Sequence, residues 1–236
     1  MTTQKRSKYI KNFTCCFSLI TILLLVFSQV ENARASHAMG LDISYTCVGP
    51  DTYEFTMNFY RDCDGMAAPS SATLNVTSPS GCGADATISL TQQGPGVEVS
   101  PLCQSELANS TCASSTGTLP GVEKYTYTGT YTFPANCDDW VISYSHCCRN
   151  DQITTLVSPA SNDLFVKSTL DNTNGLCNNG LSFTSLPVPF ICAGEPFNYN
   201  HGALDADGDS LVYTMVPPLD GPAPGTPIAF KSGYTV

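Results

Sequence analysis

The chain has 236 residues, twelve cysteines and a formal net charge of −10 at pH 7. Five of its ten basic residues and one of its twenty acidic residues lie within the first 35 positions, which leaves five basic against nineteen acidic residues, a net charge of −14, on the rest. So acidic a chain repels nucleic-acid phosphates, which argues against nucleic acid as a partner and favours divalent cations.

The first 35 residues have the three parts of a secretory signal peptide. Basic residues precede an apolar segment from Phe13 to Phe27, and Ala33-Arg34-Ala35 has the A-x-A pattern of a cleavage site. The apolar segment is shorter than the ~20 residues that a membrane-spanning helix needs, so an uncleaved anchor is the less favoured alternative. The sequence predicts a secreted mature chain that starts at Ser36 and has no membrane span.

Ten cysteines remain after the signal peptide. An even number of cysteines in a secreted chain is typical of a disulfide framework, and the sequence lacks the C-x-x-C pairs of a zinc site. The spacing does not determine which cysteines pair. The candidates are Cys47, Cys63, Cys82, Cys103, Cys112, Cys137, Cys147, Cys148, Cys177 and Cys192.

Alternating apolar and polar residues predict an all-β chain. Residues 41–47 and 53–59 alternate on either side of a Gly-Pro-Asp turn, which predicts an antiparallel hairpin whose Cys47 and Cys63 lie where a short bridge is possible. Further strands are expected at 71–77, 86–92, 123–133, 139–151, 153–157 and 163–170. No stretch has a sustained helical period, so we expect residues 36–187 to form a disulfide-stapled antiparallel β-sandwich.

Residues 139–151 contain the only tryptophan and are expected to form the central strand. Successive side chains of a strand point to opposite faces, so Trp140, Ile142 and Tyr144 are expected to share the face that forms the core. By the same alternation, Cys147 and Cys148 can each reach a different partner, which would tie this strand on both sides.

A tyrosine-rich strand precedes this central strand. Tyr125, Tyr127 and Tyr131 alternate along it, and with Trp140 they are candidates for the stacking platform of a carbohydrate-binding module. The more favoured alternative is a half-buried sheet face with the tyrosine hydroxyls at its rim.

A second module is expected at residues 188–236. Prolines flank a short apolar segment at 187–192, and the 44 residues that follow are about half of an Ig-like sandwich of ~100 residues. We therefore expect a partial Ig-, PKD- or cadherin-like module, from a chain that is a fragment or is completed by a partner. Residues 211–216 are expected to be a buried strand of it.

The sharpest local motif is DADGD at residues 205–209. Asp205, Asp207 and Asp209 alternate around a glycine turn and can converge on one calcium ion, which accepts 6–8 oxygen ligands. It is not an EF-hand, since Val216 stands at the twelfth position, where a glutamate is required. An acidic turn without metal is an equally favoured alternative.

No catalytic constellation is recognisable in the sequence. G-x-S-x-G and H-E-x-x-H do not occur, and Asp138 and Asp139 are adjacent, so on a strand they face opposite ways and cannot flank one glycosidic bond. We expect the chain not to be an enzyme.

Several segments, in their order along the chain, carry a resemblance to a known family. They are SHAMG at 36–40, ISYTC at 43–47, YEF at 53–55, YRDC at 60–63, LPGV at 119–122, YTY at 125–127, CDDW at 137–140, CCRN at 147–150, PVPFIC at 187–192 and DADGDSLVY at 205–213. In these segments the chain resembles the N-terminal region of large secreted surface proteins of Bacteroidetes, the gliding-motility-associated C-terminal-domain-containing proteins.

This resemblance implies a multi-module exoprotein with PKD- or cadherin-like repeats and a type IX secretion sorting domain, although the chain shows neither further repeats nor such a domain. It also implies a calcium-associated turn at Asp205, Asp207 and Asp209. The expected partners are further modules of the same polypeptide or cell-surface components. We therefore expect a secreted or cell-surface module with an adhesive or structural role, and the alternative is a module that binds extracellular polysaccharide.

Overall fold

The computed structural model describes residues 38–150, 153–173, 175, 177–187, 196 and 198–236. Ala35–Val236 form one compact unit. The predicted signal peptide at 1–35 and nearly all of the proline-flanked segment at 187–192 lie outside the described residues. No helix in the described ranges is long and apolar enough to cross a membrane.

Antiparallel strands dominate the structure, which confirms the all-β class. The longer strands are β1 Ala38–Gly49, β2 Thr52–Asp62, β3 Ser71–Thr77, β4 Ala86–Gln92, β6 Val122–Thr132, β7 Trp140–His146 and β8 Leu164–Leu170. The two-residue strands are β5 Val97–Glu98, β9 Ser182–Phe183, β10 Ala203–Leu204, β11 Leu219–Asp220 and β12 Thr226–Pro227, and two short 3-10 turns are η1 Leu107–Asn109 and η2 Pro159–Ser161.

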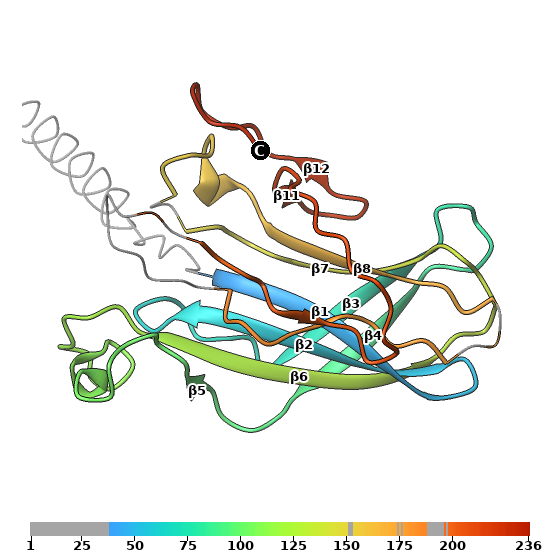
Figure 1. Ribbon diagram of the computed structural model, residues 1–236, viewed down its shortest axis with the longest axis horizontal. Coiled ribbons are helices and arrows are strands. Elements are labelled where there is room, and N and C mark those ends of the chain that lie inside the picture. The colour runs from blue at the N-terminus through green and yellow to red at the C-terminus, as the bar shows by residue number, and fades with distance from the viewer. Residues whose placement is uncertain (1–37, 151–152, 174, 176, 188–195, 197) are drawn as a thin grey trace, which may run out of the picture. The chain divides into compact units, whose positions relative to one another are not determined.

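The main sheet folds over on itself. Its strand order is β1-β2-β6-β4-β3-β7-β8, with β5 also paired to β6. Only Thr91↔Thr128 and Gln92↔Tyr127 join β4 to β6, so the sheet bends there into the layers β1-β2-β6 and β4-β3-β7-β8 (Figure 1). The Tyr45 hydroxyl of β1 donates to the Thr169 carbonyl of β8 at 2.9 Å, so the two edge strands meet across a seam. The result is a sandwich-like fold.

Most of the strands predicted from alternation are confirmed. The hairpin of β1 and β2 pairs Cys47 opposite Tyr53, and β3, β4, β6, β7 and β8 lie in the expected ranges. The strand predicted at 153–157 is wrong, because this segment has only the isolated bridge between Leu156 and Phe230. The left-handed backbone at Ser158, with φ of 47°, turns the chain into η2 before a ladder can form.

The core lies between the two layers and is rich in aromatic rings. Trp140 and Ile142 are fully buried and Tyr144 is 8% exposed, which confirms the predicted core face of β7. The Phe133 ring lies 4.9 Å from Trp140 and meets Tyr53 edge-on at 5.8 Å. Such tilted and edge-on contacts add to the stability that burial of the rings provides.

Asn172 is a buried hub, with 2% of its surface exposed. Its side-chain oxygen accepts hydrogen bonds from Trp140 Nε1 at 3.1 Å and from the Cys137 amide at 2.8 Å. Its Nδ2 donates to Asp51 Oδ1 and to the Ala135 carbonyl, both at 3.0 Å. All four hydrogen-bonding positions of the amide are thus used, and they join the β1–β2 turn, the loop before β7 and the segment after β8.

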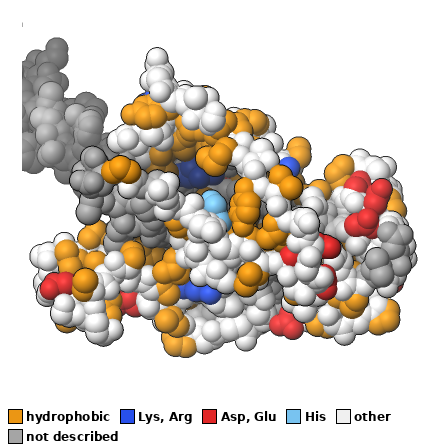
Figure 2. Space-filling model, in the orientation of Figure 1, with side chains coloured by type: hydrophobic (Ala, Val, Ile, Leu, Met, Phe, Trp, Pro, Cys, Tyr) orange, Lys and Arg blue, Asp and Glu red, His pale blue; other side chains and the backbone are white. Residues whose placement is uncertain are grey.

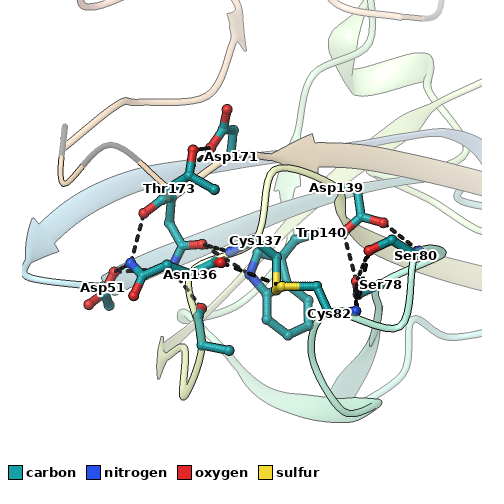
Figure 3. Close-up of a disulfide and its surroundings, with 12 residues drawn as sticks. Asp51, Ser78, Ser80, Cys82, Asn136, Cys137, Asp139, Trp140, Asp171 and Thr173 are labelled. Atoms are coloured by element: carbon teal, nitrogen blue, oxygen red, sulfur yellow. Dashed lines mark hydrogen bonds between the residues drawn. A yellow bond between two sulfur atoms is a disulfide. The ribbon is translucent and has the colours of Figure 1, made fainter.

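A disulfide and a carboxylate close the loops beside this hub (Figure 3). Cys82–Cys137 ties the β3–β4 loop to the β6–β7 loop. Asp139 accepts hydrogen bonds from the Ser78 hydroxyl at 2.7 Å and the Ser80 amide at 2.6 Å, which hold the pKa of its carboxyl below the usual value. The tryptophan ring is therefore covered by two loops that are fixed to each other.

Four disulfides form among the described cysteines, which confirms a disulfide framework. They are Cys47–Cys177, Cys63–Cys112, Cys82–Cys137 and Cys147–Cys148. Cys103 is exposed and unbonded among the described residues, and Cys192 lies outside them.

Two cysteine pairings that the strand pattern allowed do not form. The bridge between Cys47 and Cys63 does not form, because each cysteine bonds to a distant segment. Cys147 and Cys148 bond to each other instead of to separate partners. Strand β7 ends at His146, so the alternation of strand side chains does not extend to this pair.

The buried strand predicted at residues 211–216 is also wrong. These residues belong to no strand, and Val212 is 89% exposed. The described residues after 198 instead contact the sheet through other groups. Arg149 donates to the Leu219 carbonyl at 2.9 Å, and the Asp163 amide donates to Asp220 Oδ1 at 2.6 Å. The module boundary predicted at residue 188 stays a prediction.

The hub predicts the effect of one substitution. Asn172→Ala leaves the buried Trp140 and Cys137 donors without a partner, and each such group costs ~1–3 kcal/mol; the partly buried Ala135 acceptor loses its hydrogen bond as well. We expect the free energy of unfolding to fall by roughly 3 kcal/mol or more, measured by urea denaturation with the disulfides intact. Asn136→Ala is the matched control, because Asn136 is exposed and shares the acceptor Asp51. Equal losses for the two variants would contradict the role of the hub.

Candidate active surface at the β1–β8 seam

The candidate site is the seam where edge strands β1 and β8 approach without forming a ladder. A cleft of about 530 Å³ opens there. Its walls come from β1, β8 and residues 178–181, together with Asp171, Phe183 and Asp205. The charged, amide and aromatic residues that line it include Asp42, Tyr45, Lys167, Asp171, Asn178, Phe183 and Asp205.

Residues 177–180 cover the open edge of β1 at this seam. The Cys47 amide donates to Asn179 Oδ1 at 2.9 Å, and the Gly180 amide donates to the Tyr45 carbonyl at 2.8 Å. The disulfide Cys47–Cys177 holds the segment in place. A Cβ at position 180 would lie 2.7 Å from the Tyr45 ring, so glycine is needed for this close approach. The unpaired edge is thus protected from pairing with other strands.

The DADGD turn is docked onto that covering segment. Asp205 Oδ1 accepts hydrogen bonds from the amides of Asp207 and Asp209 at 2.9 and 3.1 Å, which folds the turn. The Asp207 carboxylate accepts from the Asn179 amide at 2.6 Å and from its Nδ2 at 2.9 Å. Gly208 has φ of 84°, a left-handed conformation that favours glycine.

The three predicted calcium ligands therefore have different roles in the structure. Asp205 folds the turn, Asp207 fastens it to Asn179, and the exposed Asp209 side chain accepts no hydrogen bond from the described residues. Among those residues, no group of three or more His, Cys, Asp or Glu side chains is arranged to hold a metal ion. Calcium binding stays a prediction.

The seam has an acidic character. Burial, with smaller contributions from Tyr53 and the carboxylates of Asp205, Asp171 and Asp207, raises the pKa of Tyr45 to about 12. Its hydroxyl therefore stays protonated at neutral pH and donates to β8. Figure 2 shows acidic side chains gathered toward the right-hand end of the molecule, whereas basic side chains are few. A cleft of this charge favours neutral, hydroxyl-rich or cationic ligands over anions.

The aromatic side chains predicted as a sugar-stacking platform lie elsewhere. Tyr127 and Trp140 are fully buried, so neither ring has a face available for stacking. Tyr125 is half-buried and donates to Glu123 at 3.0 Å, and Tyr131 packs edge-on against Phe133 at 5.0 Å. The half-buried sheet face that was the favoured alternative describes these residues better.

Sequence reasoning missed the exposed aromatic residue that the structure places at the cleft. Phe183 is 44% exposed and lines the seam with Asp42 and Asn178. It lies in a short stretch without strand or helix periodicity, so only the tertiary structure brings it to β1. His201 contacts it edge-on at 6.4 Å.

The docking of the turn predicts that two neighbouring carboxylates behave differently. Asp207→Ala removes two hydrogen bonds to Asn179, so we expect faster amide hydrogen exchange at Asn179 and in the peptide that contains Cys47. Asp209→Ala is the matched control and should leave these rates unchanged. The measurement is exchange followed by mass spectrometry, in calcium and again in EDTA.

The same measurement tests the predicted metal. If Asp205, Asp207 and Asp209 bind calcium together, EDTA should raise exchange across 205–209, and both variants should abolish that response. Equal rates for wild type, Asp207→Ala and Asp209→Ala in both buffers would contradict the docking and the calcium predictions alike.

No protein-family model, curated protein or solved structure matches this chain. The resemblance to Bacteroidetes surface proteins therefore stays a prediction, and the functional argument depends on the geometry of the seam and of the disulfides.

Proposed function

We propose that this chain is a non-enzymatic secreted or cell-surface module that serves as an adhesive or structural part of a larger exoprotein. The observation that carries the proposal is the set of three disulfides between segments far apart in sequence: Cys47–Cys177, Cys63–Cys112 and Cys82–Cys137. Such bonds persist in oxidising compartments outside the cytosol. They also suit a module that must stay folded outside the cell, where no chaperones refold it.

The use of polar side chains supports a structural role over catalysis. The buried amide of Asn172, the carboxylate of Asp139 and the carboxylate of Asp207 all make hydrogen bonds that hold loops together. This pattern favours a rigid binding or spacer module.

The family resemblance enters the proposal as its finer part. It implies gliding-associated Bacteroidetes exoproteins that use type IX secretion, in which further modules of the same polypeptide or cell-surface components are the partners. A calcium ion at Asp205, Asp207 and Asp209 would add rigidity to the docked turn by bridging carboxylates.

A carbohydrate-binding role is the second candidate, and the seam cleft is the site that we propose for it. Phe183 presents a partly exposed ring there, and Asp42, Asp171 and Asn178 line the same cleft. An exposed ring with nearby carboxylate and amide groups is a combination that can stack on a sugar and bind its hydroxyls. The acidic surroundings favour neutral over anionic polysaccharides.

One binding assay separates these candidates. The labelled, disulfide-bonded protein is titrated onto intact cells of its source and onto immobilised extracellular polysaccharides, with and without soluble oligosaccharides. An adhesive or structural module is expected to bind cells saturably, with no effect of sugars or of Phe183→Ala. A carbohydrate-binding module is expected to be displaced from the polysaccharide by soluble oligosaccharides. Its Phe183→Ala variant is expected to bind the polysaccharide about tenfold more weakly.

Val97→Ala is the control, because Val97 is an exposed apolar residue on β5 that does not line the seam cleft. Absence of saturable binding to both cells and polysaccharides would contradict an adhesive role and a carbohydrate-binding role alike.

A further inference from the structure

Residues 211–216 form an exposed apolar segment that lies outside every strand. Its sequence, LVYTMV, is rich in residues that favour β-strands. Val212 is 89%, Tyr213 59%, Met215 78% and Val216 65% exposed. A strand on a sheet surface buries every second side chain, whereas in this segment consecutive side chains are exposed. So much exposed apolar surface in one short segment is typical of an interaction site.

The backbone amides and carbonyls of this segment also lack hydrogen-bond partners among the described residues. Within the described part of the chain, no residue from 211 to 216 takes part in a hydrogen bond. Unpaired amides and carbonyls in a β-prone segment are a template for pairing with another strand. The segment therefore offers both parts of a β-pairing surface, which are free backbone groups and apolar side chains.

We propose that this segment pairs as an antiparallel β-strand with the same segment of a second copy of the chain. Its charge pattern favours the antiparallel over the parallel arrangement. Residues 210–218 carry no charge, the carboxylates of Asp205, Asp207 and Asp209 precede them, and Pro217 and Pro218 close them. In an antiparallel pair, the acidic end of each copy lies beside the proline end of the other. In a parallel pair, the two sets of carboxylates would lie side by side and repel.

The segment is also complementary to itself. A two-fold axis at Tyr213 places Tyr213 beside its counterpart and Leu211 opposite Met215 of the second copy, so large apolar side chains meet across the strands. An interface that uses the same patch twice is the usual form of a symmetric dimer. Because both copies are acidic overall, added salt should screen their repulsion and strengthen the dimer. This dependence is opposite to that of an interface held by ion pairs.

The test is the mass of the purified, disulfide-bonded protein in solution, measured by analytical ultracentrifugation over a range of concentration and salt. Wild type is expected to show a reversible monomer–dimer equilibrium that strengthens with salt. Thr214→Pro removes an amide donor without changing charge, and Tyr213→Lys places two lysines across the axis. Both variants are expected to weaken the dimer at least ~tenfold.

Val97→Lys is the matched control for Tyr213→Lys. It adds the same charge at another exposed apolar residue, 61% exposed and located on β5, and should leave the equilibrium unchanged. Thermal melts followed by circular dichroism check that all variants are folded. A wild-type protein that stays monomeric overturns the proposal. So does a dimer insensitive to Thr214→Pro, or a continuous series of larger species, which would indicate unspecific apolar aggregation.

Discussion

The hydrogen bonds of the Asn172 side chain are the constraint on which the rest of the structure depends. One buried amide accepts from the Trp140 indole and the Cys137 amide and donates to Asp51 and Ala135. A fully satisfied polar group in a low-dielectric interior is stable in one arrangement only, because any shift leaves buried groups without partners. It therefore fixes the place of Trp140 in the core and the meeting of three segments that are distant in sequence.

The seam between β1 and β8 is formed by the chain that follows Asn172. Beyond Asn172 the chain returns to the open edge of β1. There Cys177 forms a disulfide with Cys47, and Asn179 Oδ1 accepts a hydrogen bond from the Cys47 amide. Asp207 then fastens the later turn to Asn179. Protection of an exposed strand edge and formation of the cleft are thus achieved by the same short segment. A ligand at the cleft would meet walls held by covalent and hydrogen bonds, which suits binding without large rearrangement.

Alternation of apolar and polar residues was enough to predict the longer strands of the main sheet and the buried face of β7, because burial on one side of a sheet is a local, period-2 property. It was not enough for features set by topology. The partner of Cys47 lies 130 residues away, and Asn172 is a single asparagine in a polar stretch with no local pattern. The segment at 211–216 shows the remaining limit, since strand propensity does not say whether a partner strand is present. Asp205, Asp207 and Asp209 were recognised as a turn, but their unequal roles depend on Asn179.

Mapping of the disulfides by mass spectrometry, after digestion of the unreduced protein at acidic pH, tests this account most directly. The pairing reports which loops meet at the tryptophan and which segment covers β1. The account predicts peptides linked through Cys82–Cys137 and Cys47–Cys177, together with Cys63–Cys112 and a bond between Cys147 and Cys148. A bond between Cys47 and Cys63, or Cys137 joined to any residue other than Cys82, would contradict both the core and the seam described above.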